Sequence, residues 1–390
     1  MSEIFTFKKI YRAYLDCRKT KRKTINALKF EWNLERNIFQ LQKELVEKIY
    51  KPGRSICFVV KNPSPREIFA ANFRDRVVHH LLIREVEAIG EKTLIFDTFS
   101  CRKKKGTHLA VERLKSFVKK AAENYKKEAF FLQLDISGFF MAINHNILYS
   151  IFEKLISRQN KSRQWKEDIL WMAKVIIFYK PTENYIIKSQ PSLFKLIPER
   201  KSLFGAPANK GLPIGNYSSQ FFANLYLNKL DQLIKRDIKC KYYVRYVDDF
   251  ILLSKNKIAL SGLENKINNF LKKELDLNLN FSKTNLQSIN RGVEFLGYFI
   301  KPGYTLVKRG VVKRFKNRIF VLKRSIMAEW KLENILAMIN SYYGHFRHAF
   351  SFNLRKSIYG KGLGGGLKEK FLPSLDKNGT ADYRKIILKN

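Results

Sequence analysis

The sequence predicts an α+β protein that combines an antiparallel sheet with several helices. Alternating apolar and polar residues at 130–134 are typical of a half-buried strand. Apolar and aromatic residues on both sides of 246–249 indicate a β-hairpin with a tight turn. Apolar residues at helical spacing in 1–50, and a helix at 307–330 that is apolar on one side and basic on the other, supply the α component.

Charge points to the class of partner. The chain has 390 residues, enough for two or three subdomains with a shared core. Its 75 Lys and Arg residues exceed its 34 Asp and Glu residues, and the resulting net charge of +41 is spread over most of the chain. Because phosphate contacts supply most sequence-independent affinity for nucleic acids, a polyphosphate backbone is the expected partner.

A membrane surface would also attract positive charge, but the sequence favours a cytoplasmic protein with no membrane partner. No apolar run reaches about 18 residues, and no signal peptide opens the chain. The cysteines show no Cys-x-x-Cys spacing, so we expect free thiols and no zinc site. They are Cys17, Cys57, Cys101 and Cys240.

Residues 1–50 are expected to form an N-terminal helical extension with a basic break at 18–23. The break could touch nucleic acid or be a solvated loop. We expect the apolar residues of both helices to pack in the core. These residues are Ile4, Phe5, Phe7, Ile10, Tyr11 and Tyr14 in the first helix, and Leu28, Trp32, Leu34, Ile38, Leu41 and Val46 in the second.

A basic hairpin is expected next, with strands at 56–60 and 66–69 and a helix that opens at residue 72. His79 and His80 are not expected to bind metal, because adjacent helical residues face different ways. A basic loop at 100–108 then precedes a helix. Either this loop holds nucleic-acid phosphates or it is merely exposed; the cations concerned are Arg102, Lys103 and Lys104.

Carboxylates stand at two strand ends. The strand at 130–134 ends at Asp135, and the predicted hairpin turn carries Asp248 and Asp249. An isolated Asp-Asp pair could simply be a solvated turn, but a buried pair would repel and is best stabilised by a cation. Two magnesium ions about 3.5–4 Å apart, clamped by carboxylates at strand ends, are the usual means of in-line phosphoryl transfer.

Between the two acidic stretches lies a loop at 210–220 that contains Gly211, Pro213 and Gly215. Glycine allows the backbone of such a loop to approach a ligand closely. A helix is expected at 221–231, with Ser219 as a candidate cap.

Together these stretches resemble the A, B and C motifs of reverse transcriptases, with Asp135 in the first and Tyr246 to Asp249 in the last. Most reverse transcriptases carry Gln before the second glycine of the B motif, where this chain has Ile214. Together with Lys201 to Phe204 and Arg74 to His80, this detail resembles the reverse transcriptases of diversity-generating retroelements. The resemblance covers roughly residues 50–350.

The resemblance implies a right-hand polymerase of fingers, palm and thumb, with an antiparallel palm sheet and a helical thumb. The implied boundaries are 1–50 for an N-terminal helical extension, 51–125 for the fingers, 126–300 for the palm with an insertion at about 175–210, 301–359 for the thumb, and 360–390 for a Gly-rich linker and basic tail.

The implied activity is RNA-directed DNA polymerase, a nucleotidyltransferase that uses two Mg²⁺ ions, for which Mn²⁺ could substitute. The implied metal site is Asp135, Ile136, Asp248 and Asp249, and Lys283 would serve the leaving pyrophosphate. The implied dNTP site is Lys61, Arg66, Arg74, Phe140, Ile214, Gly215 and Gln220. The implied nucleic-acid contacts are Arg102, Lys103, Lys104, Gly297, Lys313, Arg314, Lys316 and Arg318.

Two of these residues carry a physical argument. A large ring at Phe140 beneath the sugar would clash with a 2′-hydroxyl and select deoxynucleotides; core packing is the alternative. Ile214 cannot hydrogen-bond a nucleotide as Gln could, which favours weaker checking of base-pair geometry and error-prone copying.

The implied partners are a dedicated noncoding or template-repeat RNA, a primer, the cDNA, dNTPs, and an accessory protein or partner reverse transcriptase. A defence-associated reverse transcriptase acting in antiphage immunity shares the same core and remains the nearer alternative. A non-catalytic RNA-binding protein is more distant, because the acidic set is intact. The sequence shows no nuclease, ribonuclease H, integrase or zinc-cluster signature, which argues against a complete mobile intron protein.

Overall fold

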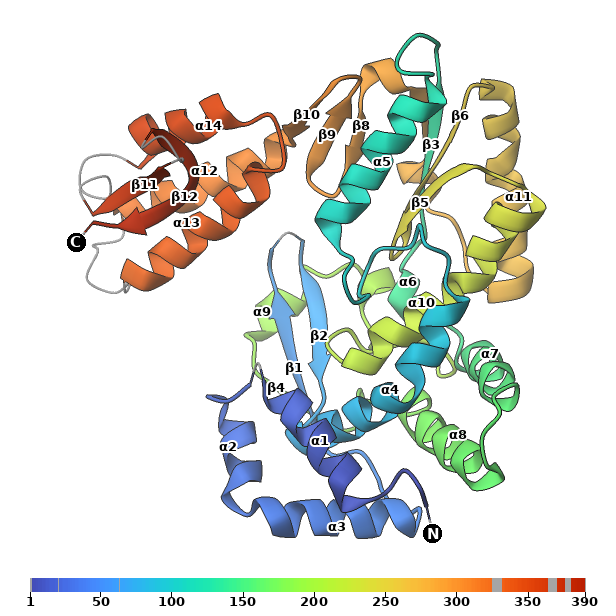
Figure 1. The fold of residues 1–390 in the computed structure, drawn as a ribbon. Helices are drawn as coiled ribbons and strands as arrows, with labels where there is room; N and C mark the ends of the chain where they lie inside the picture. The colour runs from blue at the N-terminus through green and yellow to red at the C-terminus, as the bar shows by residue number, and fades with distance from the viewer. Residues whose placement is uncertain are drawn as a thin grey trace. The chain divides into compact units, whose positions relative to one another are not determined.

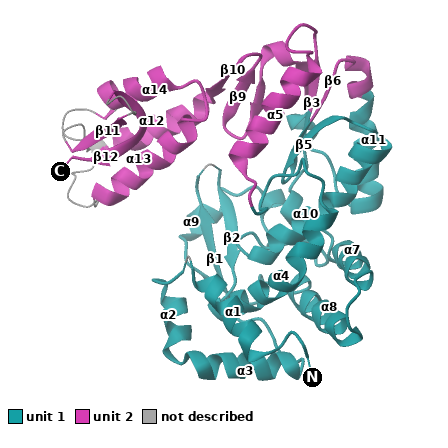
Figure 2. Cartoon of the chain, in the orientation of Figure 1, with its two compact units in different colours: residues 1–103, 133–251, 262–284 teal, residues 104–132, 252–261, 285–390 magenta. Residues whose placement is uncertain are grey.

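Helices and short strands alternate along the chain (Figure 1), which confirms the predicted α+β class. The computed structural model describes residues 2–19, 21–62, 64–324, 332–363, 370–375 and 380–389. The chain divides into two compact units, coloured separately in Figure 2. Unit 1 comprises residues 1–103, 133–251 and 262–284, and unit 2 comprises residues 104–132, 252–261 and 285–390.

Unit 1 contains a three-stranded sheet with β1 (Ser55–Val60) at its centre. Strand β2 (Arg66–Ala70) pairs antiparallel with β1, and β4 (Tyr185–Ile187) pairs parallel with the other edge of β1. The predicted basic hairpin is therefore confirmed, with Ile56 opposite Ala70. Pro63, in its loop, lies outside the described residues.

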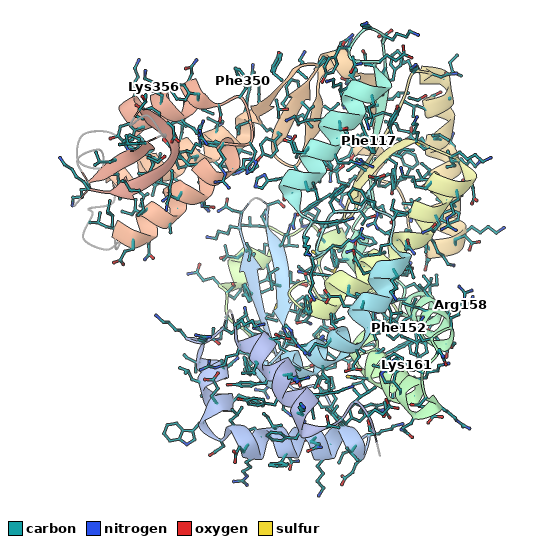
Figure 3. All side chains as sticks on the ribbon, viewed as in Figure 1. Phe117, Phe152, Arg158, Lys161, Phe350 and Lys356 are labelled. Atoms are coloured by element: carbon teal, nitrogen blue, oxygen red, sulfur yellow. The ribbon has the colours of Figure 1, made fainter. Side chains whose placement is uncertain are left out.

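The remaining elements of unit 1 are mainly helical. They are α1 (Phe7–Arg18), α2 (Ile25–Trp32), α3 (Leu34–Val46), α4 (Phe73–Thr93), α6 (Phe139–Ala142), α7 (His145–Ser157), α8 (Arg163–Ile177), α9 (Pro191–Phe194), η1 (Glu199–Lys201), α10 (Tyr217–Gln232), η2 (Leu233–Asp237) and η3 (Phe281–Lys283). Asn72 caps α4 and Asn144 caps α7, because their side chains accept backbone N–H groups of the first turn. Helix α4 packs against α1 and α10. Phe152 of α7, labelled in Figure 3, meets Phe222 of α10 edge to face.

The N-terminal helices differ from the expectation in two ways. The second predicted helix is broken at Asn33, which separates α2 from α3. Ile38 and Leu41 are fully buried as predicted, but four other residues expected in the core are exposed: Trp32 (87%), Val46 (52%), Leu28 (51%) and Tyr11 (37%). The prediction that these four residues pack in the core is therefore wrong. For Leu28 and Trp32 the reason is the break at Asn33, which turns that part of α2 toward solvent.

A four-stranded sheet has the order β5–β6–β3–β7 and carries the acidic strand ends. Its strands are β3 (Phe130–Asp135), β5 (Tyr242–Tyr246), β6 (Asp249–Ser254) and β7 (Asn285–Ser288). Strands β3 and β6, and the helix α11 (Lys257–Leu275), each contribute residues to both units. Among the described residues, no helix is both long and apolar enough to cross a membrane.

Unit 2 combines a small antiparallel sheet, of order β10–β9–β8, with helices. Its elements are α5 (Thr107–Ala121), η4 (Ile289–Arg291), β8 (Val293–Phe295), β9 (Tyr298–Lys301), β10 (Tyr304–Val307), α12 (Arg309–Arg324), α13 (Leu332–Phe346), α14 (Phe352–Ser357), η5 (Ile358–Gly362), β11 (Phe371–Leu375) and β12 (Ala381–Leu388). Buried residues of α12 and α13, among them Phe315 and Tyr343, form one core cluster with Ile386 of β12.

Two further expectations need correction. Helix α10 begins at Tyr217, earlier than predicted, and its N-cap position is Asn216; Ser219 is thus a buried residue inside the helix and does not cap it. The segment expected to be a basic tail contains β11 and β12, which pair antiparallel. Residues 364–369, within the expected linker and tail, and 325–331, at the end of the predicted basic helix, lie outside the described residues.

Candidate active site

Three carboxylates from two distant stretches meet at adjacent strand ends. Asp135 is the last residue of β3, Asp249 is the first residue of β6, and Asp248 lies in the turn before it. Because β3 and β6 are neighbours in the sheet, these ends lie side by side. The hairpin turn and the strand that ends at Asp135, both predicted from local pattern, are confirmed.

The surroundings of these carboxylates disfavour bare negative charge. Burial, together with the charges of Asp248 and Asp135, raises the pKa of Asp249 to about 7, although Gln133 Nε2 donates to its Oδ1 at 3.0 Å. Burial and the charge of Asp135 also raise the pKa of Asp248. Such a site gains free energy by binding either protons or cations.

Asp135 already has a cationic partner. Lys283 Nζ lies 2.8 Å from Asp135 Oδ2, and Asn280 Nδ2 donates to the same oxygen at 3.2 Å. The backbone N–H of Asn280 also donates to the Asp135 carbonyl at 2.8 Å. The resemblance predicts Lys283 as a site residue, whereas the sequence does not single out Asn280. Asn280 alternates with apolar residues just as Asn278 does, so the sequence gives no distinct signal for it, yet it is only 7% exposed.

The hairpin turn has an unusual backbone. Val247 has φ of 58°, in the left-handed region that a β-branched residue rarely adopts. Its carbonyl accepts a hydrogen bond at 2.9 Å from Nη1 of Arg245, which is fully buried. The turn that carries Asp248 is thus held from the protein side by a buried guanidinium.

A buried network in turn holds Arg245. Asp231 of α10 accepts from Arg245 Nε at 2.7 Å and from Nη2 at 2.6 Å, a bidentate ion pair at 0% side-chain exposure. Tyr243 Oη donates to Asp231 Oδ1 at 2.7 Å and Thr98 Oγ1 donates to Oδ2 at 3.2 Å. We did not predict this network. Its only signal in the sequence is an arginine among apolar residues in a predicted strand.

The donor chemistry of the acidic cluster suits magnesium, since Mg²⁺ prefers carboxylate oxygens. Even so, among the described residues no group of three or more His, Cys, Asp or Glu converges as a ready-made metal cage. The reason is visible in the hydrogen bonds: Asp135 is turned toward Lys283, and Asp249 toward Gln133. Ligation would require side-chain rotation, and Ile136 could contribute only its backbone carbonyl.

The three candidate phosphate-binding cations lie in different surroundings. Arg66, exposed at the start of β2, is close enough to lower the pKa of Asp248. Lys61 is exposed in the hairpin loop. Arg74 instead forms an ion pair with Glu44 and stacks over the Tyr50 ring at 4.9 Å. The structure therefore brings Arg66, and not Arg74, to the carboxylates.

Two candidate nucleotide-contacting residues share a cluster behind the basic hairpin. Phe140 and Ile214 pack against a buried group that includes Cys57 and Phe69 of the hairpin strands. The Ile214 carbonyl accepts from Phe69 N–H at 2.9 Å. This contact holds the loop of the B motif along β2.

The next two residues of this motif differ in their surroundings. Gly215 has φ of 126°, and a Cβ there would lie 2.8 Å from Ile68 Cγ2, so this position requires glycine. Gln220 is exposed on α10.

Among the candidate nucleic-acid contacts of the basic loop, only Lys104 is without a described ion pair. Arg102 has a 5% exposed side chain, pairs with Glu91 and donates to the carbonyls of Ile95 and Thr98. Lys103 pairs with Glu87.

In unit 2 the candidates lie on the outer side of α12 and in the turn before β9. The exposed basic residues of α12 include Lys313, Arg314, Lys316 and Arg318, opposite the buried Phe315 and Ile319. Gly297 has φ of 87°, and a Cβ there would lie 3.0 Å from His345 Nε2. The four basic residues therefore lie on the exposed face of α12, and Gly297 lies in a tightly packed turn.

Two sequence comparisons relate this chain to known proteins. Residues 49–300 match the family described as "Reverse transcriptase (RNA-dependent DNA polymerase)". The "Putative COX1/OXI3 intron 2 protein" of Saccharomyces cerevisiae is 21% identical over 309 residues, which cover 70% of this chain and 35% of that protein. The chain thus spans about a third of the length of this curated relative. The sequence argues against a complete mobile intron protein, and this match covers only part of one.

Solved telomerase structures align over most of the chain at low identity. Apo telomerase from Candida tropicalis has a TM-score of 0.48 and 12% identity, over 79% of this chain and 55% of that one. Telomerase from Candida albicans, solved with a fragment of telomeric RNA, has a TM-score of 0.46 and 12% identity, over 83% of this chain and 63% of that one.

Proposed function

Because this chain belongs to the reverse transcriptase family, we propose that it synthesises DNA on an RNA template by two-metal nucleotidyl transfer. The observation that carries the mechanism is the meeting of Asp135, Asp248 and Asp249 at adjacent strand ends, where burial and mutual repulsion favour cation binding.

The proposed chemistry assigns a role to each carboxylate and cation. Asp135, Asp248 and Asp249 would hold two Mg²⁺ ions, which supply activation of the 3′-hydroxyl and neutralisation of phosphate charge when bound. The 3′-oxygen attacks the α-phosphorus, the bond to pyrophosphate breaks, and the hydroxyl proton passes to solvent water. Arg66 contacts the triphosphate, and Lys283 donates a proton to the departing pyrophosphate.

Nucleotide selection is assigned to Phe140 and Ile214, which pack against the buried cluster of Cys57 and Phe69. Phe140 is half-buried on that cluster, and this restraint supports its proposed role as the ring that would clash with a 2′-hydroxyl. Ile214 presents an aliphatic side chain where a hydrogen-bonding one would check the base pair. This supports a deoxynucleotide polymerase with low fidelity.

Template and product contacts would come from unit 2 and from the basic loop. The basic face of α12 is proposed to lie along the duplex as part of a thumb at 301–359, with fingers at 51–125 and palm at 126–300. The net charge of +41 supports a nucleic-acid partner. In the basic loop, Lys104 is a better candidate than Arg102, whose guanidinium is satisfied within the protein.

For biological role we propose cDNA synthesis from a dedicated RNA, with errors at template adenines, as in diversity-generating retroelements. The support is the B-motif loop, in which Ile214 is anchored to β2 and no side-chain amide is present at that position. An accessory protein or a partner reverse transcriptase belongs to this proposal.

The test is to purify the protein with the RNA it carries, add labelled dNTPs and Mg²⁺, and sequence both the RNA and the DNA product. Heterogeneous cDNA altered at adenines, copied from a repeat-containing RNA, is the expected result. A simple repeat or homopolymer made from a structured noncoding RNA would instead indicate antiphage defence. No synthesis under any condition would leave RNA binding alone.

A further inference from the structure

Unit 1 contains a second concave site, formed by the N-terminal helices and the outer face of the basic hairpin. It is a cavity of about 460 Å³ lined by α2, β1 and the start of α4. This volume falls within the range of about 300–1,000 Å³ that small-ligand sites occupy. Ile25, at its rim, is 69% exposed, so the cavity opens to solvent.

The charge of the cavity wall is entirely positive. Lys21, Arg76 and Lys188 line it together with neutral residues, and no Asp or Glu does. Neither lysine has an ion pair with a carboxylate in the part of the chain that the structure describes. Arg76 is half-buried and donates Nε to the Ala71 carbonyl, which leaves its positive charge uncompensated by a described acid. Three such cations around one cavity favour an anionic ligand.

The floor of the cavity is apolar and lies on the face of β1 away from the nucleotide-selecting cluster. Ile56 and Phe58 of β1 line the cavity. Cys57, between them, belongs to the cluster that includes Phe140 and Ile214. Because successive side chains of a strand point to opposite faces, the cavity and that cluster lie on opposite faces of β1. The cavity is therefore separate from the nucleotide-selecting cluster.

We infer that this cavity binds one phosphorylated nucleotide, with its base on Phe58 and Ile25 and its phosphate between Lys21, Arg76 and Lys188. An aromatic surface beside unpaired cations is the combination by which proteins bind single-stranded nucleic acid without reading its sequence. The nucleotide could be a unit of an RNA strand or a free molecule. The statement that the nucleotide belongs to an RNA strand rests on the proposed function. The statement that the cavity binds a nucleotide does not.

The first experiment measures binding without catalysis, in EDTA and without dNTPs. The double variant Lys21→Gln/Lys188→Gln is compared with Lys154→Gln/Lys174→Gln, which removes the same charge from exposed residues of α7 and α8. Those helices flank the loop that carries Arg158 and Lys161 in Figure 3. The readout is the dissociation constant of a labelled single-stranded RNA over a salt series.

Each phosphate contact adds about 0.7 to the salt slope for single strands. Because the cavity is proposed to hold one phosphate, the cavity variant should lose about 0.7 of the slope and the control variant should keep the wild-type slope. Equal slopes in the two double variants would count against the cavity.

The second experiment does not depend on a variant. Wild-type protein is photocrosslinked to single-stranded RNA that contains 4-thiouridine, and the crosslinked peptides are identified by mass spectrometry. Peptides that contain Phe58 or Ile25 are expected. Adenosine 5′-monophosphate is the competitor: loss of these crosslinks means that a free nucleotide suffices, and their persistence means that the strand is the ligand.

Crosslinks confined to peptides outside the cavity, with equal salt slopes, would overturn the inference. Primer extension measured on the same preparations separates the two hypotheses, since a protein that crosslinks through the cavity but makes no DNA would contradict the polymerase and not the cavity.

Discussion

Lys283 Nζ lies 2.8 Å from Asp135 Oδ2, although 148 positions separate the two residues in the chain. The same carboxylate is one of the three that we propose to bind metal. Lys283 therefore cannot neutralise Asp135 and serve a leaving group in the same arrangement. Metal binding at Asp135 should release the lysine toward the pyrophosphate.

Lys283→Met is expected to separate these two roles. Removing the competing ammonium should lower the Mg²⁺ concentration needed for half-maximal activity. Loss of the proton donor should reduce maximal turnover by about 10²-fold or more. Single-nucleotide addition over a Mg²⁺ titration measures both quantities, and Lys283→Arg is the control that keeps the charge. An unchanged turnover would show that Lys283 is only a counter-ion.

Asp248→Asn is expected to abolish primer extension because it removes the charge of a proposed metal ligand without changing the size of the side chain. Wild-type protein should gain thermal stability from Mg²⁺, since a ligand that binds only the folded state stabilises it. The variant should gain less. Its circular dichroism should match that of the wild type. An Asp248→Asn protein that still extended a primer would refute the proposed mechanism.

The ion pair between Arg245 and Asp231 should matter more for the conformation of the Asp248 turn than for the free energy of unfolding. Asp231→Asn leaves a buried guanidinium without its counter-charge and should cost about 3–5 kcal/mol of unfolding free energy. The double variant Arg245→Met/Asp231→Leu should recover most of that loss, since well-packed apolar pairs can replace buried ion pairs. It should still extend primers poorly, because the Val247 carbonyl loses its donor. Denaturant unfolding and primer extension together measure the two effects.

Phe140→Ala should relax sugar selection. The ring packs on the buried cluster of Cys57 and Phe69, and this packing should restrain it in the position proposed to exclude a 2′-hydroxyl. The ratio of dNTP to NTP incorporation should fall by about 10- to 100-fold, the range typical of a steric pocket. Phe139→Leu, at a buried neighbour, is the comparison. An unchanged ratio in Phe140→Ala would assign this ring to packing alone.

Acid should destabilise the protein in part through His79. Burial, with the charges of His80 and Arg76, lowers the pKa of His79 to about 3, and its Nδ1 lies 2.5 Å from Ser218 Oγ. Between pH 3 and 6.5 the unfolded chain binds a proton that the folded protein does not, so stability falls as pH decreases through this window.

The slope should reach about 1.4 kcal/mol per pH unit for this group. Urea unfolding at pH 7 and pH 5 should show a smaller loss in His79→Gln than in the wild type. An equal loss would mean that other groups dominate.

Features set by neighbouring residues could be predicted from the sequence, and those set by distant partners could not. The strand ending at Asp135 follows from alternation of apolar and polar residues, and the turn at Asp248 follows from the apolar and aromatic residues on both sides of it; both are local patterns. Arg74 forms an ion pair with Glu44 of α3, and no residue near Arg74 in the sequence predicts this partner. For the same reason Asp231 could not be matched to Arg245, because one lies on a helix and the other on a strand.

Exposure at the N-terminus was mispredicted for a related reason. Helical spacing places Leu28 and Trp32 with the core residues of α3, provided that the helix is continuous. The backbone at Asn33 leaves the helical region, with φ of −125° and ψ of 54°, and this one residue changes which side of α2 faces solvent. The helical periodicity of apolar residues alone does not predict such a break.

Strands β3 and β6 each supply residues to both compact units, and the chain passes between the units repeatedly before residue 285. A contiguous fragment that contains all of unit 1 must therefore also carry the unit 2 segments 104–132 and 252–261. A truncation variant is thus a poor way to study the acidic cluster without unit 2, because any truncation between these segments removes strands from both units. Complementation by two co-expressed halves, divided in a loop, respects this connectivity better than deletion from either end.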